Sequence, residues 1–141
     1  MITRKASAVW KGDLKGGKGE VSTESGAHDD ASYALGTGLE EGGGTHAEEL
    51  LGAAHAGCFS MALSGELSKA GYTPEKIKTS AKVSMRKDEG GFTITGVHLE
   101  VRGEVPGADQ AAFEKAANAA KAGCPVSRAL GVEITVSASL D

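Results

Sequence analysis

The sequence is poor in aromatic residues, and its two cysteines do not form a C-x-x-C pair. Aromatic side chains make up only 4% of the 141 residues, whereas 21 residues are glycine. The core must therefore be built from small and aliphatic side chains around closely approaching backbones. Two cysteines are too few for a disulfide framework, and the missing C-x-x-C pair disfavours thioredoxin-like chemistry. No Walker A pattern is present, and the glycine-rich segments 12–19 and 42–44 are typical of turns.

Charge and hydropathy exclude further classes of protein. The chain has 15 basic and 19 acidic residues, a net charge of −4, and no basic patch of the kind that nucleic-acid binding requires. Its richest apolar stretch, residues 50–63, contains His55 and is shorter than the ~20 residues that span a bilayer. The basic N-terminus is not followed by the apolar run of a signal peptide. We therefore expect a cytoplasmic protein with neither nucleic-acid nor membrane partners.

The spacing of apolar residues predicts the order of elements within a single domain, residues 1–141. Alternation predicts strands over 5–11, 20–24, 77–86 and 132–140. Another strand begins at Phe92, and its phase slips near Gly96, which indicates a β-bulge. Helices are predicted over 45–70, with Thr45 and Glu48 as a capping box, and over 109–121. Pro125 can open a further short helix. Residues 25–44 show no periodicity.

This order of elements predicts an α+β fold, in which a mostly antiparallel sheet packs on a long buried helix. The helix over 45–70 is apolar nearly all round, which is typical of a helix with no exposed face. A single sheet cannot cover such a helix on every side. The sequence therefore predicts that a second subunit covers the remainder, in an intimate homodimer.

Cys58 and Cys124 are the candidate reactive residues. Cys58 lies in the middle of the long helix, and Cys124 directly precedes the helix that Pro125 opens. Both thiols could simply be small buried side chains, as free cysteines often are. However, the unpaired N–H groups at a helix start favour a thiolate, so local physics predicts that Cys124 is the more acidic thiol. Cys58 would need a cation brought to it from elsewhere.

A zinc site is a weaker alternative, and the histidines and acidic residues have simpler explanations. His55 and Cys58 can share a helix face, but no C-x-x-C or H-x-x-x-H pair accompanies them. His98 is in phase with outward polar residues, so we expect it to be solvated. The remaining candidate ligands are Cys124, His28 and His46.

Glu48 and Glu49 lie in the first turn of the long helix, where acidic residues complement the helix dipole. Glu48 precedes Cys58 by ten residues, or ~15 Å along one helix. The two side chains can therefore act together only if a two-fold axis brings Glu48 of one chain to Cys58 of another.

Four segments together resemble the OsmC/Ohr family of osmotically inducible and organic hydroperoxide resistance proteins, and most closely its OsmC branch. The segment 45–64 resembles the family's first cysteine helix, and Lys121-Ala122-Gly123-Cys124-Pro125-Val126-Ser127 resembles its second cysteine motif. Residues 10–13 and 19–26 also match. The resemblance implies an OsmC-like fold and an intertwined homodimer with two sites at the subunit interface.

The resemblance also implies a function in the oxidative stress response. It makes Cys58 the peroxidatic thiol, Cys124 the resolving thiol, and Glu48 the residue that orients a catalytic arginine. The expected reaction reduces an organic hydroperoxide to an alcohol through a Cys58 sulfenic acid and a redox-active Cys58–Cys124 disulfide. A dithiol reductant of the lipoyl type then restores the thiols, and no cofactor or metal is needed.

The sequence departs from the family pattern at the catalytic arginine. Gly38 stands at that position in an ungapped alignment, and no arginine occurs between Arg4 and Arg86. This departure leaves an alternative open, namely an OsmC-like protein that is catalytically weak or inactive and serves as a small-molecule-binding or scaffold protein. The candidates that could stabilise the Cys58 thiolate instead are Arg128, His46 and His55.

Overall fold

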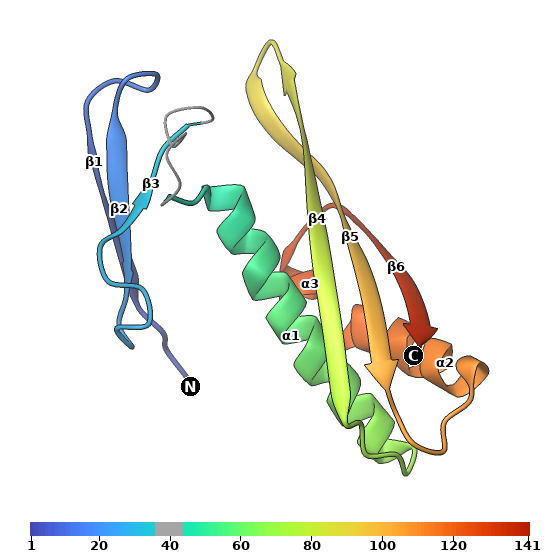
Figure 1. The fold of residues 1–141 in the computed structure, drawn as a ribbon. Helices are drawn as coiled ribbons and strands as arrows, with labels where there is room; N and C mark the ends of the chain where they lie inside the picture. The colour runs from blue at the N-terminus through green and yellow to red at the C-terminus, as the bar shows by residue number, and fades with distance from the viewer. Residues whose placement is uncertain (36–43) are drawn as a thin grey trace. The chain divides into compact units, whose positions relative to one another are not determined.

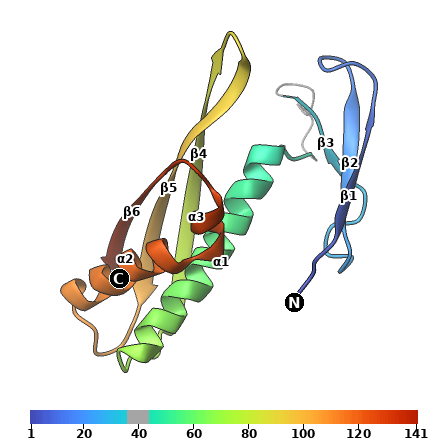
Figure 2. The ribbon, with the colours of Figure 1, turned by 180° about the vertical axis from the view of Figure 1, so that it is seen from behind.

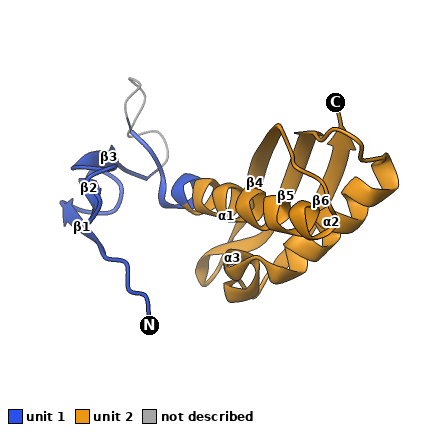
Figure 3. Cartoon of the chain, turned by 90° about the horizontal axis from the view of Figure 1, so that it is seen from below, with its two compact units in different colours: residues 1–50 blue, residues 51–141 orange. Residues whose placement is uncertain are grey.

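The computed structural model describes residues 1–35 and 44–141, which form two compact units. The first unit is Met1–Leu50 and the second is Leu51–Asp141 (Figure 3). Gly38 and the first part of the predicted turn at 42–44 lie outside the described residues.

The first unit contains a three-stranded antiparallel sheet in the order β1-β2-β3. Strands β1 (Ala6–Lys11) and β2 (Lys18–Thr23) form the predicted hairpin. Strand β3 (Ala31–Tyr33) lies in the segment for which the sequence predicted no structure, because three residues are too few for a visible alternation. Gly19 of β2 is required by close packing, since a Cβ there would lie 2.6 Å from the Tyr33 ring.

The second unit contains a sheet in the order β4-β5-β6. Strands β4 (Lys76–Asp88) and β5 (Gly91–Glu104) are antiparallel, whereas β6 (Glu133–Leu140) is parallel to β5. Ser84 pairs with Gly96 while Met85 pairs with Ile94, which leaves Thr95 as an extra residue in β5. The predicted β-bulge near Gly96 is thus confirmed.

Three helices accompany this sheet: α1 (Ala47–Lys69), α2 (Gln110–Gly123) and α3 (Pro125–Ala129). In the second unit, α1 and α2 lie on the same face of the sheet (Figures 1 and 2). The end of α1 and the start of α2 follow the sequence signals. Gly71 has φ of +91° directly after α1, and the Asp109 carboxylate accepts a hydrogen bond from the Ala112 N–H at 2.8 Å, at the start of α2. No described helix is long and apolar enough to cross a membrane.

The core of the second unit lies between these helices and the sheet. Its fully buried side chains include Phe59, Leu63 and Leu67 from α1, Leu99 and Val101 from β5, and Phe113 from α2. Cys124, at the junction of α2 and α3, belongs to the same cluster.

The predicted capping box at the start of α1 is wrong by one residue. The helix begins at Ala47, and the Thr45 hydroxyl donates to the Glu49 carboxylate at 3.0 Å rather than capping a peptide N–H. Thr45 is displaced from the cap because its own backbone N–H donates to Ser32 O at 2.9 Å, beside β3. A capping residue cannot be located from the local sequence alone when a neighbouring strand also holds it.

Helix α1 is buried along one face only within a single chain. Its buried residues follow a helical stripe and are Gly52, His55, Phe59, Leu63 and Leu67. Its opposite face is exposed and consists of small or apolar residues, namely Ala53, Ala54, Gly57, Met61 and Gly65. Met61 has a relative exposure of 77%. The expectation of a helix buried all round is therefore not met within one chain.

Candidate active site

The two cysteines meet in the second unit. Their Sγ atoms are 3.0 Å apart, although the residues are 66 positions apart in the chain. Cys58 comes from the middle of α1 and is partly exposed, whereas Cys124 lies between α2 and α3 and is fully buried. Both are free thiols. A disulfide bond is ~2.05 Å long, so the sulfurs need to approach by only about 1 Å to form one.

The surroundings of the two sulfurs favour ionisation of Cys124. Burial opposes it, but hydrogen bonds from the Cys58 thiol, from the Ser127 N–H and hydroxyl, and from the Val126 N–H together lower the pKa of Cys124. Burial raises the pKa of Cys58, as do the hydrogen bond and the charge of Cys124, and the Val126 N–H offsets this only in part. The surroundings thus favour the charged form of Cys124 and the protonated form of Cys58. This direction agrees with the argument from the helix start.

His55 is a fully buried polar residue beside this pair, one turn before Cys58 on α1. Its Nε2 lies 2.7 Å from the Ser127 hydroxyl of α3, and its Nδ1 has no hydrogen-bond partner among the described residues. Burial lowers the pKa of His55, so the imidazole is neutral near pH 7. Ser127 is the one site residue to which the sequence assigned no role. Its place three residues after Cys124, like that of His55 three before Cys58, is the signal that could have found it.

The structure does not bring Arg128 to the thiols. Arg128 is exposed in the last turn of α3, and its side chain makes no hydrogen bond or ion pair with any described residue. It does not contribute to the pKa of either cysteine. Within the described part of one chain, the Cys58 thiolate therefore has no cationic partner from the second unit.

The other predicted residues lie apart from the cysteine pair or in the first unit. In the first unit, His28 is exposed and Glu48 is half-buried. His46 there lies 3.9 Å from the Glu49 carboxylate. Helix α1 continues without a break from Glu48 to Cys58. The two residues are therefore ~15 Å apart along it, as expected from the sequence.

His98 is hydrogen-bonded, and the described residues form no group that could hold a metal ion. His98 is not simply solvated, since its Nδ1 lies 2.6 Å from the Thr135 hydroxyl and its Nε2 lies 3.3 Å from that of Ser137. Over residues 1–35 and 44–141, no three His, Cys, Asp or Glu side chains gather in a group that could hold a metal ion.

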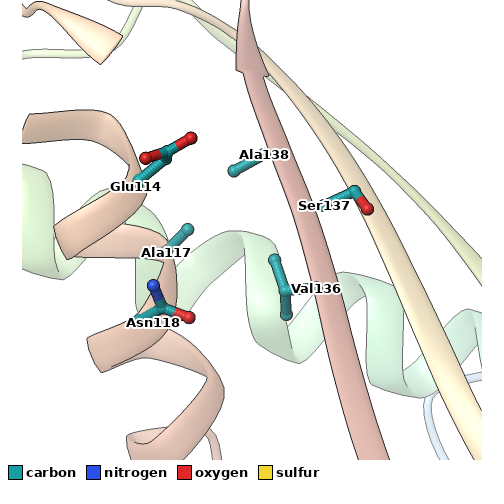
Figure 4. A pocket seen from close by; sticks show the side chains of 6 residues that line it. All are labelled: Glu114, Ala117, Asn118, Val136, Ser137 and Ala138. Carbon is teal, nitrogen blue, oxygen red and sulfur yellow. The ribbon is translucent and has the colours of Figure 1, made fainter. Parts of the chain in front are cut away.

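A hollow of about 400 Å³ lies between α2 and β6 (Figure 4). Its lining residues are Glu114, Ala117, Asn118, Val136, Ser137 and Ala138. Neither cysteine is among them. The site is thus defined by the cysteine pair and its hydrogen bonds, and not by this hollow.

The fold and the site together define an α+β protein that carries two free thiols with their sulfur atoms 3.0 Å apart. Residues 40–139 match the family of OsmC-like proteins. The chain is 50% identical over 139 residues to peroxiredoxin OsmC of Escherichia coli strain K12, an alignment that covers 99% of this chain and 97% of the relative. The chain belongs to the OsmC family.

Solved structures agree with this assignment. The organic hydroperoxide resistance protein OhrB of Bacillus subtilis is 27% identical with a TM-score of 0.74, over 97% of this chain and 98% of that one. The organic hydroperoxide resistance protein OsmC of Legionella pneumophila is 28% identical with a TM-score of 0.76, over 100% of this chain and 98% of that one. The predicted α+β, OsmC-like fold is thus confirmed.

Proposed function

We propose that this chain is a thiol-dependent peroxidase that reduces organic hydroperoxides to alcohols. The observation that carries the proposal is the 3.0 Å contact between the Sγ atoms of Cys58 and Cys124. This contact occurs in a chain that is 50% identical to a peroxiredoxin. No metal or organic cofactor is required, because sulfur itself accepts the peroxide oxygen.

The reaction has three steps, each balanced in atoms and electrons. The Cys58 thiolate attacks the outer oxygen of the hydroperoxide, the O–O bond breaks, and the alkoxide leaves as an alcohol after taking a proton from solvent. The Cys124 thiolate then attacks the sulfur of the Cys58 sulfenic acid and displaces hydroxide, which becomes water. Finally, a dithiol reductant of the lipoyl type reduces the disulfide by thiol–disulfide exchange and is itself oxidised.

Exposure supports the roles of the two thiols. Cys58 is partly exposed, so a peroxide can reach its sulfur, whereas Cys124 is fully buried. The order of acidity is the reverse, since Cys124 has the lowered pKa. Cys58 therefore reacts first because of access, and Cys124, whose pKa is lowered, is suited to resolve the sulfenic acid. Cys58 packs against the apolar core of the second unit, and this setting favours an organic hydroperoxide over hydrogen peroxide.

We further propose that the active form is a homodimer. The support is the exposed face of α1, where Gly57, Met61 and Gly65 form a small, apolar surface that a second helix could approach closely. A second chain would also solve the geometric problem of Glu48, which cannot reach Cys58 of its own chain along an unbroken helix. In this arrangement Glu48 and His46 of one chain serve the Cys58 of the other. We place the protein in the cytoplasm, where thiols are kept reduced.

The test is peroxide treatment of the reduced protein, followed by intact-mass measurement and thiol counting. Stoichiometric cumene hydroperoxide should oxidise Cys58 and yield a Cys58–Cys124 disulfide, faster than hydrogen peroxide does. Cys124→Ser should react once and stop as a sulfenic acid or over-oxidise, and Cys58→Ser should not react. If both thiols of the wild-type protein remain titratable in excess peroxide, the chain is a non-catalytic binding or scaffold protein instead.

A pH series separates the candidates for the positive group. If His46 stabilises the Cys58 thiolate, alkylation of Cys58 below the pKa of that thiol should be faster with the histidine present than without it. His46→Ala should abolish the effect, and Arg128→Ala is the matched control because Arg128 has no contact with the thiols. Slower alkylation in Arg128→Ala alone would overturn the assignment to His46.

A further inference from the structure

The hollow between α2 and β6 takes no part in the chemistry of the cysteines, and it lies beside the open edge of a sheet (Figure 4). In the order β4-β5-β6, strand β6 pairs with β5 on one side, and no described strand pairs with its other side. An unpaired strand edge presents a row of backbone N–H and C=O groups to which another extended chain can bind. Strand β6 therefore has the backbone groups to which a further strand could be added.

Hydrogen bonds at the end of β6 show which of its backbone groups face the open edge. The Asp141 N–H, directly after the strand, donates to a carbonyl of β5 at 2.9 Å. The Ala138 C=O and the Leu140 N–H instead bond to the Gln110 side chain of α2. Because the direction of these groups alternates along a strand, the N–H and C=O groups of Val136 and Ala138 point away from β5. Both residues line the hollow.

The Gln110 side chain already occupies one end of this edge. Its Nε2 donates to Ala138 O at 2.8 Å, and its Oε1 accepts from the Leu140 N–H at 3.2 Å. These are an acceptor and a donor that a neighbouring strand would otherwise use, and no other described side chain bonds to this edge. The Ala138 N–H and both backbone groups of Val136 are therefore left for a ligand.

Two polar side chains of α2 accompany the open part of the edge. Glu114 and Asn118 follow Gln110 at intervals of four residues, so the three share one face of the helix, and the first two line the hollow (Figure 4). The Gln110 Nε2 donates to Glu114 Oε1 at 2.9 Å, which orients the carboxylate. No described basic side chain pairs with Glu114, and Asn118 makes no hydrogen bond from its side chain to a described residue.

We propose that this hollow binds an extended peptide segment of another protein, which adds a strand to the edge of β6 and places a lysine or arginine against Glu114. An extended backbone offers N–H and C=O groups at the same alternating spacing as the edge. The negative charge of Glu114, which has no basic partner among the described residues, selects a basic side chain. The Asn118 amide can both donate to and accept from the peptide backbone. The inference does not rest on the proposed peroxidase, because neither cysteine lines the hollow.

The experiment titrates a capped peptide of sequence Thr-Val-Lys-Val-Thr into the reduced, isotope-labelled full-length chain and follows the backbone amides by NMR. The amides of Val136 and Ala138 should shift and exchange more slowly with solvent. Those of Thr135 and Ser137, which point at β5, should change less. Of two peptide analogues, N-methylated either at both valines or at the lysine, one should lose binding, because only one set of N–H groups can face β6.

Variants of the protein test the role of charge. Glu114→Gln should weaken binding of the lysine peptide roughly two- to fivefold, the effect of one exposed ion pair. It should not change binding of a peptide that has glutamine in place of the lysine. Glu100→Gln is the matched control, because Glu100 is also exposed but lies on β5 and outside the lining of the hollow. This control should bind the lysine peptide as wild type does.

Each other result at this edge would overturn the proposal. If the amides of Val136 and Ala138 do not move in millimolar peptide, the edge of β6 accepts no strand. If a capped single lysine produces the same shifts, the hollow holds a small cation and not a peptide. If both N-methylated analogues bind as the parent does, backbone pairing is wrong. If the same amides shift with protein concentration alone, this edge is an interface between copies of the chain.

Discussion

Replacing Met61 by Glu tests whether a second subunit covers α1. Met61 is 77% exposed in the single chain, so the substitution costs the isolated protomer little, and Glu is as good a helix former as Met. In a homodimer that buries this face, each protomer would lose roughly 1–2 kcal/mol of apolar burial. Because both protomers carry the substitution, the dimer loses this burial twice. With the cost of burying the carboxylates, the free energy of dimerisation weakens by about 2–5 kcal/mol.

A loss of this size raises the dimer dissociation constant roughly 30- to 4000-fold. Sedimentation velocity over a concentration series should show wild type as a dimer and Met61→Glu as a monomer at micromolar concentration, with unchanged helix content by circular dichroism. Met61→Leu keeps the apolar volume and should stay dimeric. A Met61→Glu chain that sediments as wild type does would refute the placement of the interface. A folded wild-type monomer would refute the homodimer itself.

Three further predictions concern the second unit. Gly103→Ala should lower the free energy of unfolding by about 1–3 kcal/mol in a denaturant titration, because its Cβ would lie 2.6 Å from the buried Phe113 ring; Gly131→Ala, with open space around it, should change little. Because burial lowers the pKa of His55, this histidine is protonated at a higher pH in the unfolded chain than in the folded one. The free energy of unfolding should therefore fall as the pH drops below about 6.5, and this dependence should be weaker in His55→Gln. Asp109→Ala removes the cap of α2 and should cost about 1 kcal/mol, without altering cysteine alkylation.

Local patterns were sufficient for most of the fold. The alternation in β4, the left-handed Gly71 and the capping Asp109 each encode an element boundary within a few residues of sequence, and the phase slip beside Gly96 located a bulge. Strand β3 was not predicted, because its three residues are too few to show an alternation. The start of α1 was misplaced because Thr45, which precedes the helix, donates its backbone N–H to Ser32 O beside β3.

Less of the site than of the fold could be predicted from local sequence patterns. That Cys124 would be the more acidic thiol followed from its place before Pro125, and the structure agrees. The meeting of two cysteines 66 positions apart was expected only from the resemblance to a family. The contact between His55 and Ser127 spans 72 positions and has no pattern of its own. Such contacts are set by the packing of helices, which a periodicity cannot reveal.

Because of where the two cysteines lie, oxidation would also change the stability of the fold. A bond between Cys58 and Cys124 would close a covalent ring that contains the second half of α1, both long strands of the hairpin, and α2. A ring of this size lowers the entropy of the unfolded chain enough to add about 4 kcal/mol of stability in the loop-closure account. The free energy of unfolding of the second unit would therefore rise on oxidation and fall on reduction in each catalytic cycle. The oxidised protein should resist proteases and denaturants that attack the reduced one.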